Sequence, residues 1–98
     1  MAKAALHHHS KLTYPDGSVR EMILWRLPAT TPDRPHGLKY RLHYGLADGT
    51  CLVRYDNESG KGDHRHYCGR EDSYRFTTVE ALIEDFLADV VKLKKVRK

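Results

Sequence analysis

The segment from Leu38 to Leu46 constrains the fold more than any other, because large apolar and polar residues alternate along it without a break. Every second position is a leucine or a tyrosine, and Lys39, Arg41 and His43 lie between them. A β-strand points successive side chains to opposite faces of its sheet, so this pattern predicts one apolar face and one basic face. The chain is therefore expected to bury one side of a sheet and to leave cations on the other.

Turn sequences on both sides of this segment predict neighbouring strands. Pro15-Asp16-Gly17 and Asp48-Gly49 are typical of hairpin tips, and the proline-rich residues 29–37 predict a loop. Strands are predicted within residues 4–14, 18–27, 38–46, 50–55 and 73–77. Because these two turns each join neighbouring strands as a hairpin, an antiparallel meander is the simplest topology.

Residues 78–95 have the pattern of one long amphipathic helix. The spacing of Thr77 and Glu80 is that of a capping box, and acidic residues precede basic ones along the segment. The predicted apolar stripe consists of Val79, Leu82, Ile83, Phe86, Val90 and Leu93. We therefore expect an α+β fold in a single domain spanning residues 1–98. It consists of an antiparallel β-meander of four to five strands with one long C-terminal α-helix packed on one face.

Composition limits the function classes. The 98 residues are 40% hydrophobic and 31% charged, which is typical of one globular domain. No apolar segment approaches the roughly 20 residues that cross a bilayer, so we expect a cytoplasmic protein without membrane contact. Cys51 and Cys68 have no zinc or redox spacing, and no cofactor is predicted. The net charge of +4 favours a polyanion or an acidic protein as partner.

The densest group of reactive side chains lies in the predicted functional loop, residues 56–72. Its first eleven residues, Asp56-Asn57-Glu58-Ser59-Gly60-Lys61-Gly62-Asp63-His64-Arg65-His66, contain three carboxylates, two histidines and two cations. Imidazoles titrate near neutral pH, so His64 and His66 are candidates for proton transfer, with Asp63 to orient a ring. This set suits cleavage of an RNA phosphodiester without a metal ion. The predicted substrate contacts are Lys39, Arg41, His43, Arg54, Lys61 and Arg65.

Other interpretations of the same residues stay open. A glycine-rich charged loop is often only a solvated turn, and Lys39 and Arg41 can simply face solvent. The spacing of His64 and His66 also suits a metal pair completed by Asp63 or Asp56, which would indicate a metal-dependent nuclease. A third alternative is a non-catalytic module that binds nucleic acid or protein through a basic sheet face.

Several motifs make the chain resemble the TumE-like family of small bacterial proteins. These are Trp25-Arg26-Leu27-Pro28, Leu38-Lys39-Tyr40-Arg41-Leu42-x-Tyr44, Arg54-Tyr55-Asp56-Asn57-x-x-Gly60-Lys61-Gly62-Asp63-His64-Arg65-His66, and Tyr74-x-Phe76. The resemblance implies a toxin of a toxin–antitoxin pair, an antitoxin partner with a helix-turn-helix domain, and a bacterial cytoplasmic setting. It carries no assignment of catalytic residues. Together with the loop chemistry, it leads us to expect a toxin that acts on RNA as a metal-independent ribonuclease.

Overall fold

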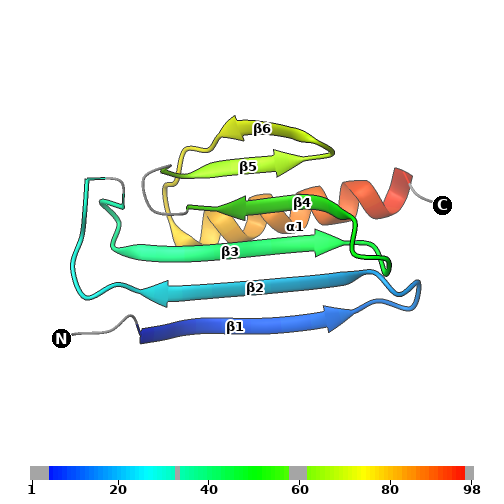
Figure 1. The fold of residues 1–98 in the computed structure, drawn as a ribbon, viewed down its shortest axis with the longest axis horizontal. Helices are drawn as coiled ribbons and strands as arrows, with labels where there is room; N and C mark the ends of the chain where they lie inside the picture. Colours follow the sequence, from blue (N-terminus) through cyan, green and yellow to red (C-terminus); the bar gives the residue numbers. More distant parts are fainter. Residues whose placement is uncertain (1–4, 33, 58–61, 97–98) are drawn as a thin grey trace.

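Six strands and one helix make up the described part of the chain, residues 5–32, 34–57 and 62–96, in a computed structural model (Figure 1). All six strands form one antiparallel sheet in the order β1-β2-β3-β4-β5-β6. The elements are β1 (Ala5–Thr13), β2 (Val19–Arg26), β3 (Leu38–Gly45), β4 (Cys51–Asp56), β5 (His64–Tyr67), β6 (Arg70–Ser73) and α1 (Val79–Val96). The α+β class, the meander and the C-terminal helix are confirmed, but the predicted four to five strands were too few.

The additional strands lie in the segment that was predicted as a loop. Residues 56–72 contain β5 and most of β6, joined by a two-residue turn at Cys68 and Gly69. Both turn residues have positive φ, 48° and 87°, as the tightest hairpin turns require. The edge strand predicted at 73–77 was wrong, since β6 ends at Ser73. These two strands are short and almost wholly polar, so they carry no apolar alternation that a sequence pattern can detect.

One face of the sheet and the helix form the core. Leu24, Leu42 and Phe86 are fully buried there, and Figure 1 shows α1 running behind the strands. The core cluster is Met22, Leu24, Tyr40, Leu42, Tyr44, Val53, Tyr55, Leu82, Phe86, Val90 and Leu93. Val79 and Ile83, the other two members of the predicted stripe, pack partly against it. The predicted placement of the helix on the apolar face of the sheet is confirmed.

Side-chain caps fix the ends of the elements. The Thr78 hydroxyl accepts a hydrogen bond from the Ala81 amide at 3.0 Å, so Thr78 is the helix cap and the predicted cap at Thr77 was one residue early. At the two predicted hairpin tips, the Asp16 and Asp48 carboxylates accept from the amides of Ser18 and Thr50, each at 2.9 Å. These local bonds stabilise the two hairpin turns.

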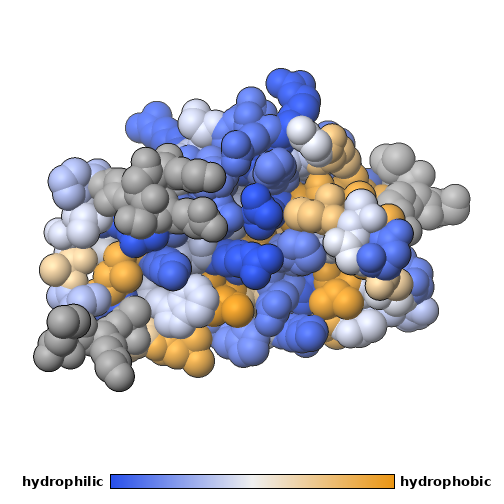
Figure 2. Space-filling model, viewed as in Figure 1, coloured by the Kyte–Doolittle hydropathy of each residue, from blue (hydrophilic) through white to orange (hydrophobic). Residues whose placement is uncertain are grey.

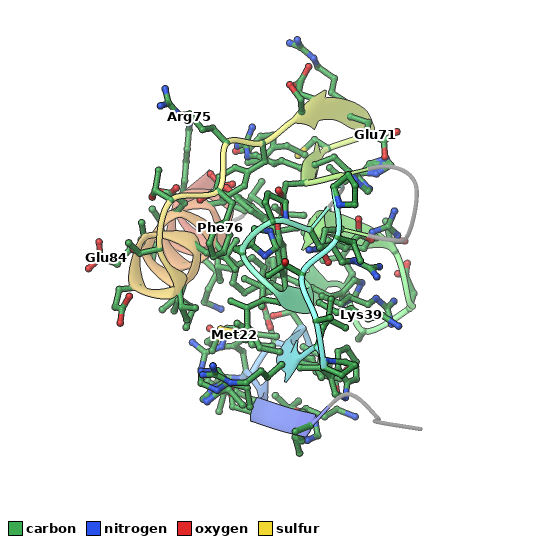
Figure 3. The ribbon with its side chains drawn as sticks, turned by 90° about the vertical axis from the view of Figure 1, so that its left-hand side faces the viewer. Met22, Lys39, Glu71, Arg75, Phe76 and Glu84 are labelled. Atoms are coloured by element: carbon green, nitrogen blue, oxygen red, sulfur yellow. The ribbon has the colours of Figure 1, made fainter. Side chains whose placement is uncertain are left out.

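Among the described residues, no helix covers the opposite side of the sheet, which we call the open face. Because directly paired residues share a face, the strand register assigns Lys39, Arg41 and His43 to it. Hydrophilic residues dominate the centre of this face in Figure 2. Seen from the side, Lys39 and Glu71 lie across the sheet from Glu84 of α1 (Figure 3). The predicted row of Lys39, Arg41 and His43 thus lies on the face opposite the core, which no helix of the described residues covers.

Candidate functional site

The strand register aligns two histidines and an arginine across the open face. His43 of β3 pairs with Arg54 of β4, which pairs with His66 of β5, which in turn pairs with Glu71 of β6. Cβ atoms of directly paired residues lie about 4.5–5.5 Å apart, so the side chains of such a line are neighbours. We call His43, Arg54 and His66 the His–Arg–His row. Two imidazoles thus flank one guanidinium on an exposed sheet surface.

His64 lies in the adjacent line of the register, Arg41–Asp56–His64. Its Nε2 contacts the Asp56 carboxylate and lies 3.3 Å from Glu71 Oε2, while its Nδ1 lies 3.2 Å from the Gly62 carbonyl oxygen. Both ring nitrogens therefore face protein oxygen atoms. The His64 side chain is only 10% exposed, so it is held inside the cluster.

Asp56 links His64 to the His–Arg–His row. Its Oδ2 lies 3.0 Å from Arg54 Nε, and the Asp56 side chain is 8% exposed. The distance makes this an ion pair, although Arg54 Nε lacks hydrogen-bond geometry to any partner among the described residues. One carboxylate thus anchors both Arg54 and His64. The Nη1 and Nη2 atoms of Arg54 can therefore contact other partners.

His66 lies beside both Arg54 and Glu71. Its Nδ1 lies 3.4 Å from Arg54 Nη2 and 3.8 Å from Glu71 Oε2. The neutral ring can accept a hydrogen bond from the arginine, and the protonated ring can face the carboxylate. The His66 side chain is 32% exposed, so a ligand can reach it.

His43 is biased toward its uncharged form. Burial lowers the pKa of His43 below its ordinary value, and the charges of Arg41 and Arg54 lower it further. Gly45 makes room for the ring, because a Cβ at that position would lie 2.9 Å from His43 Cε1. An uncharged imidazole beside two arginines can accept a proton at neutral pH.

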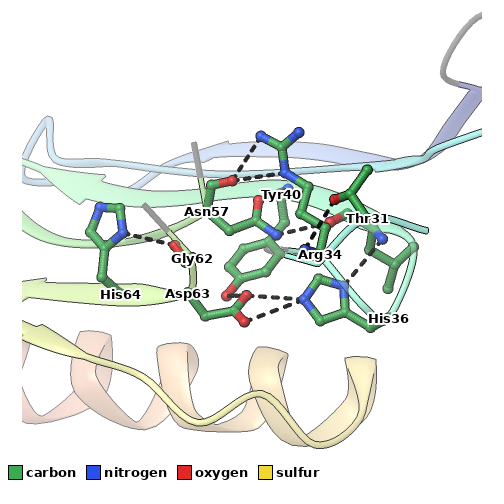
Figure 4. A network of polar contacts seen from close by, with 9 residues as sticks. Thr31, Arg34, His36, Tyr40, Asn57, Gly62, Asp63 and His64 are labelled. Atoms are coloured by element: carbon green, nitrogen blue, oxygen red, sulfur yellow. Dashed lines mark hydrogen bonds and ion pairs between the residues drawn. The ribbon is translucent and has the colours of Figure 1, made fainter. Parts of the chain in front are cut away.

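Asp63, predicted to orient the loop histidines, instead belongs to a different network (Figure 4). Tyr40 Oη donates to Asp63 Oδ1 at 2.6 Å, and His36 Nε2 lies 3.1 Å from the same oxygen. His36 Nδ1 accepts from the Leu38 amide at 3.1 Å, which leaves the hydrogen on Nε2 for Asp63. The carboxylate that contacts His64 is Asp56, so the orienting role predicted for Asp63 does not fit its placement.

The other predicted substrate contacts do not lie together at one site either. Arg65 points toward α1, where its Nε lies 2.8 Å from Asp89 Oδ2 and 3.0 Å from Tyr55 Oη. The hydrogen bond to Asp89 raises the pKa of Arg65, and its predicted contact with substrate does not fit this position. Lys39 lies at the edge of the open face, with its Nζ 5.3 Å from the centroid of the Trp25 ring. Lys61 lies outside the described residues.

Two site residues received no catalytic role from the sequence. Asp56 entered only the metal-binding alternative, although its position two residues after Arg54 already places both on one face of a strand. Glu71 joins the site only through the β5–β6 hairpin, for which the sequence has no clear signal. The described residues contain no group of three or more His, Cys, Asp or Glu side chains arranged to hold a metal ion.

The site is thus an exposed polar surface on a small α+β domain. The chain belongs to the family described as Toxin TumE, whose model matches residues 4–94. It is therefore a toxin component of a toxin–antitoxin system, and the family implies an antitoxin partner. The chain has no significant match among curated proteins or solved structures. Across the part of the chain that the structure describes, no helix is long and apolar enough to span a membrane.

Proposed function

We propose that this toxin cleaves RNA without a metal ion, using the His–Arg–His row on the open face. The observation that carries the proposal is the alignment of His43, Arg54 and His66 on three adjacent strands. Two proton-transfer groups on either side of a cation are what cleavage of an RNA phosphodiester requires. The exposed Arg41 in the adjacent line adds a second positive charge for the phosphate.

In the proposed reaction, Arg54 and Arg41 hold the phosphoryl oxygens. His43 takes the proton of the 2′-hydroxyl, and the 2′-oxygen attacks phosphorus. The bond from phosphorus to the 5′-oxygen breaks, and protonated His66 gives its proton to that oxygen. The products are a 2′,3′-cyclic phosphate and a 5′-hydroxyl end, with His43 protonated and His66 neutral. No other reactant is needed, so protons and charge balance.

His64 has a positioning role in this proposal. The sequence suggested it for proton transfer, but both of its ring nitrogens face protein oxygens. Its contact with Asp56 holds the carboxylate that also faces Arg54 Nε. We therefore expect a His64 variant to misplace Arg54 and to raise KM as well as lower kcat.

The proposed partners follow from the same assignment. RNA is the substrate, the protein acts in the cytoplasm where RNA is available, and the antitoxin carries a helix-turn-helix domain. The antitoxin domain and the cytoplasmic setting rest on the family resemblance. A non-catalytic RNA-binding module remains the second candidate, because Lys39 and Arg41 are exposed on the open face and suit phosphate contact alone.

The test is cleavage of a single-stranded RNA by the purified toxin in excess EDTA. We expect His43→Ala and His66→Ala each to reduce the rate by about 100-fold or more, the usual contribution of a general acid or base. His9→Ala is the matched control, because His9 lies on the open face two strands from His43 and contacts Glu21 instead. That variant should retain the wild-type rate.

Three outcomes would refute the proposed mechanism. Equal rates for the wild type and the His66→Ala variant would show that the His–Arg–His row takes no part in catalysis. RNA binding without any cleavage by the wild type would favour the binding module. Loss of cleavage in EDTA, with recovery on adding a divalent ion, would indicate a metal-dependent nuclease.

A further inference from the structure

We propose that the outer face of α1 binds a second copy of this chain, helix against antiparallel helix. The residues concerned, which we call the α1 patch, are Glu84, Leu87, Ala88, Val91 and Lys92. They line a shallow depression of about 570 Å³ on the helix. Figure 3 shows Glu84 on the side of α1 that faces away from the sheet. The inference does not depend on the proposed cleavage reaction.

The α1 patch is more apolar than the solvent side of a covering helix needs to be. The core stripe already includes Leu82, Phe86 and Val90, which are at most 1% exposed. Leu87, which packs partly against the core cluster, and Val91 form a second apolar pair four residues apart, and Val91 is 52% exposed. A helix with one buried face is ordinarily polar on the opposite face, so a second apolar strip indicates a second contact.

The charges of the α1 patch identify the partner as another copy of the chain. Glu84 lies four residues before Ala88, and Lys92 lies four residues after it. A two-fold axis at Ala88 places Glu84 of each copy opposite Lys92 of the other, which forms two ion pairs. A parallel arrangement would instead oppose like charges. The small side chain of Ala88 lets the helices approach closely at the axis.

The geometry around the α1 patch leaves these charges available. Lys92 is exposed, and its Nζ lies 5.9 Å from the Tyr67 ring centroid, a weak contact that a carboxylate can replace. Glu84 is exposed as well. Two chains joined through α1 would point their open faces away from each other, so each sheet would stay accessible. A helix pair buries less than the roughly 800 Å² per partner of a standard interface, so we expect micromolar or weaker affinity.

Sedimentation equilibrium of the purified toxin, from about 5 to 500 µM, tests the interface. The wild type should show a reversible monomer–dimer equilibrium. Glu84→Lys and Lys92→Glu should each weaken the dimer by about 10-fold, because each opposes two pairs of like charges. The double variant Glu84→Lys with Lys92→Glu restores opposite charges, so its dissociation constant should return to within about threefold of the wild type. All three variants should keep the wild-type circular dichroism spectrum, since both positions are exposed.

Glu21→Lys is the control for the change in net charge. Glu21 lies on β2 and is assigned by the register to the open face, far from the α1 patch. Its dissociation constant should match the wild type. A wild type that remains monomeric throughout the range would overturn the inference, as would single variants that dimerise normally or a double variant that does not recover. If Val91→Asp abolishes antitoxin binding without changing the self-association, the α1 patch belongs to the antitoxin instead.

Discussion

The two faces of the sheet are held together by different forces. On the helix side, Leu24, Leu42 and Phe86 are fully buried and the contacts are apolar. On the open face, the buried side chains of Asp56 and His64 and the partly exposed Arg54 form ion-pair contacts. Apolar burial supplies most of the free energy of folding, whereas in a buried ion pair the cost of desolvation offsets much of the attraction. Substitutions on the helix side should therefore mainly lower stability, whereas substitutions on the open face should mainly lower activity.

The largest effect on stability is expected from Phe86→Ala. Removing this fully buried ring should lower the free energy of unfolding by about 3–5 kcal/mol, through lost burial and the cavity that remains. Urea denaturation followed by circular dichroism measures the change. Val91→Ala on the exposed side of the same helix should change it by less than about 0.5 kcal/mol. Similar losses for the two variants would mean that α1 does not pack as described.

Asn57→Ala is expected to have the next largest effect. Asn57 is fully buried, accepts from the Tyr40 amide at 3.0 Å and donates to the Leu38 carbonyl at 2.8 Å. Its removal leaves buried backbone groups of β3 without partners, which should cost about 1–3 kcal/mol in urea denaturation. An unchanged urea midpoint would show that the Asn57 side chain does not stabilise the start of β3.

A smaller effect should appear as a pH dependence of stability. Burial and the neighbouring arginines lower the pKa of His43 in the folded chain, so the unfolded chain binds the proton more readily. Stability should therefore be unaffected above the ordinary histidine pKa of about 6.5 and should fall as the pH drops through the lowered pKa. In urea midpoints measured from pH 8 to pH 5, His43→Gln should lose this part of the decline. The same decline in both proteins would place the titrating group elsewhere.

The smallest change in stability is expected for Arg41→Gln. Arg41 is exposed, so the free energy of unfolding should stay within about 0.5 kcal/mol of the wild type. RNA cleavage should nevertheless fall about 10-fold or more, because a cation near the phosphate is lost. Initial rates at several RNA concentrations and urea midpoints measure both quantities. A large loss of stability alongside the loss of cleavage would contradict the expected difference between the two faces of the sheet.

The helix side of the sheet was the part that could be predicted from the sequence. The alternation in 38–46 and the helical stripe each place apolar residues at fixed spacing, and the structure buries them together. The β5–β6 hairpin was not predicted, because its strands are polar and its turn is Cys68-Gly69 rather than a typical Asn-Gly. The sequence of a strand that is stabilised mainly by its neighbours carries little signal of its structure.

The same hairpin explains which site residues were misplaced. Once His64 begins a strand, alternation sends His64 and His66 to one face and Arg65 to the other. Asp63 precedes the strand and joins His36 and Tyr40. When the start of β5 is not known, the four consecutive residues from Asp63 to His66 look like a single reactive group. The sequence therefore identified the loop histidines but could not separate the carboxylate that contacts His64 from the one that does not.

The central claim is that RNA binds the open face at the His–Arg–His row. It is tested most directly by NMR titration of the isotope-labelled toxin with an RNA oligonucleotide that cannot be cleaved because its 2′-hydroxyls are methylated. We predict saturable amide shift changes centred on His43, Arg54 and His66, with none at Ala88 and Val91 of α1. Shift changes confined to α1, or no saturable change at the row, would contradict the account.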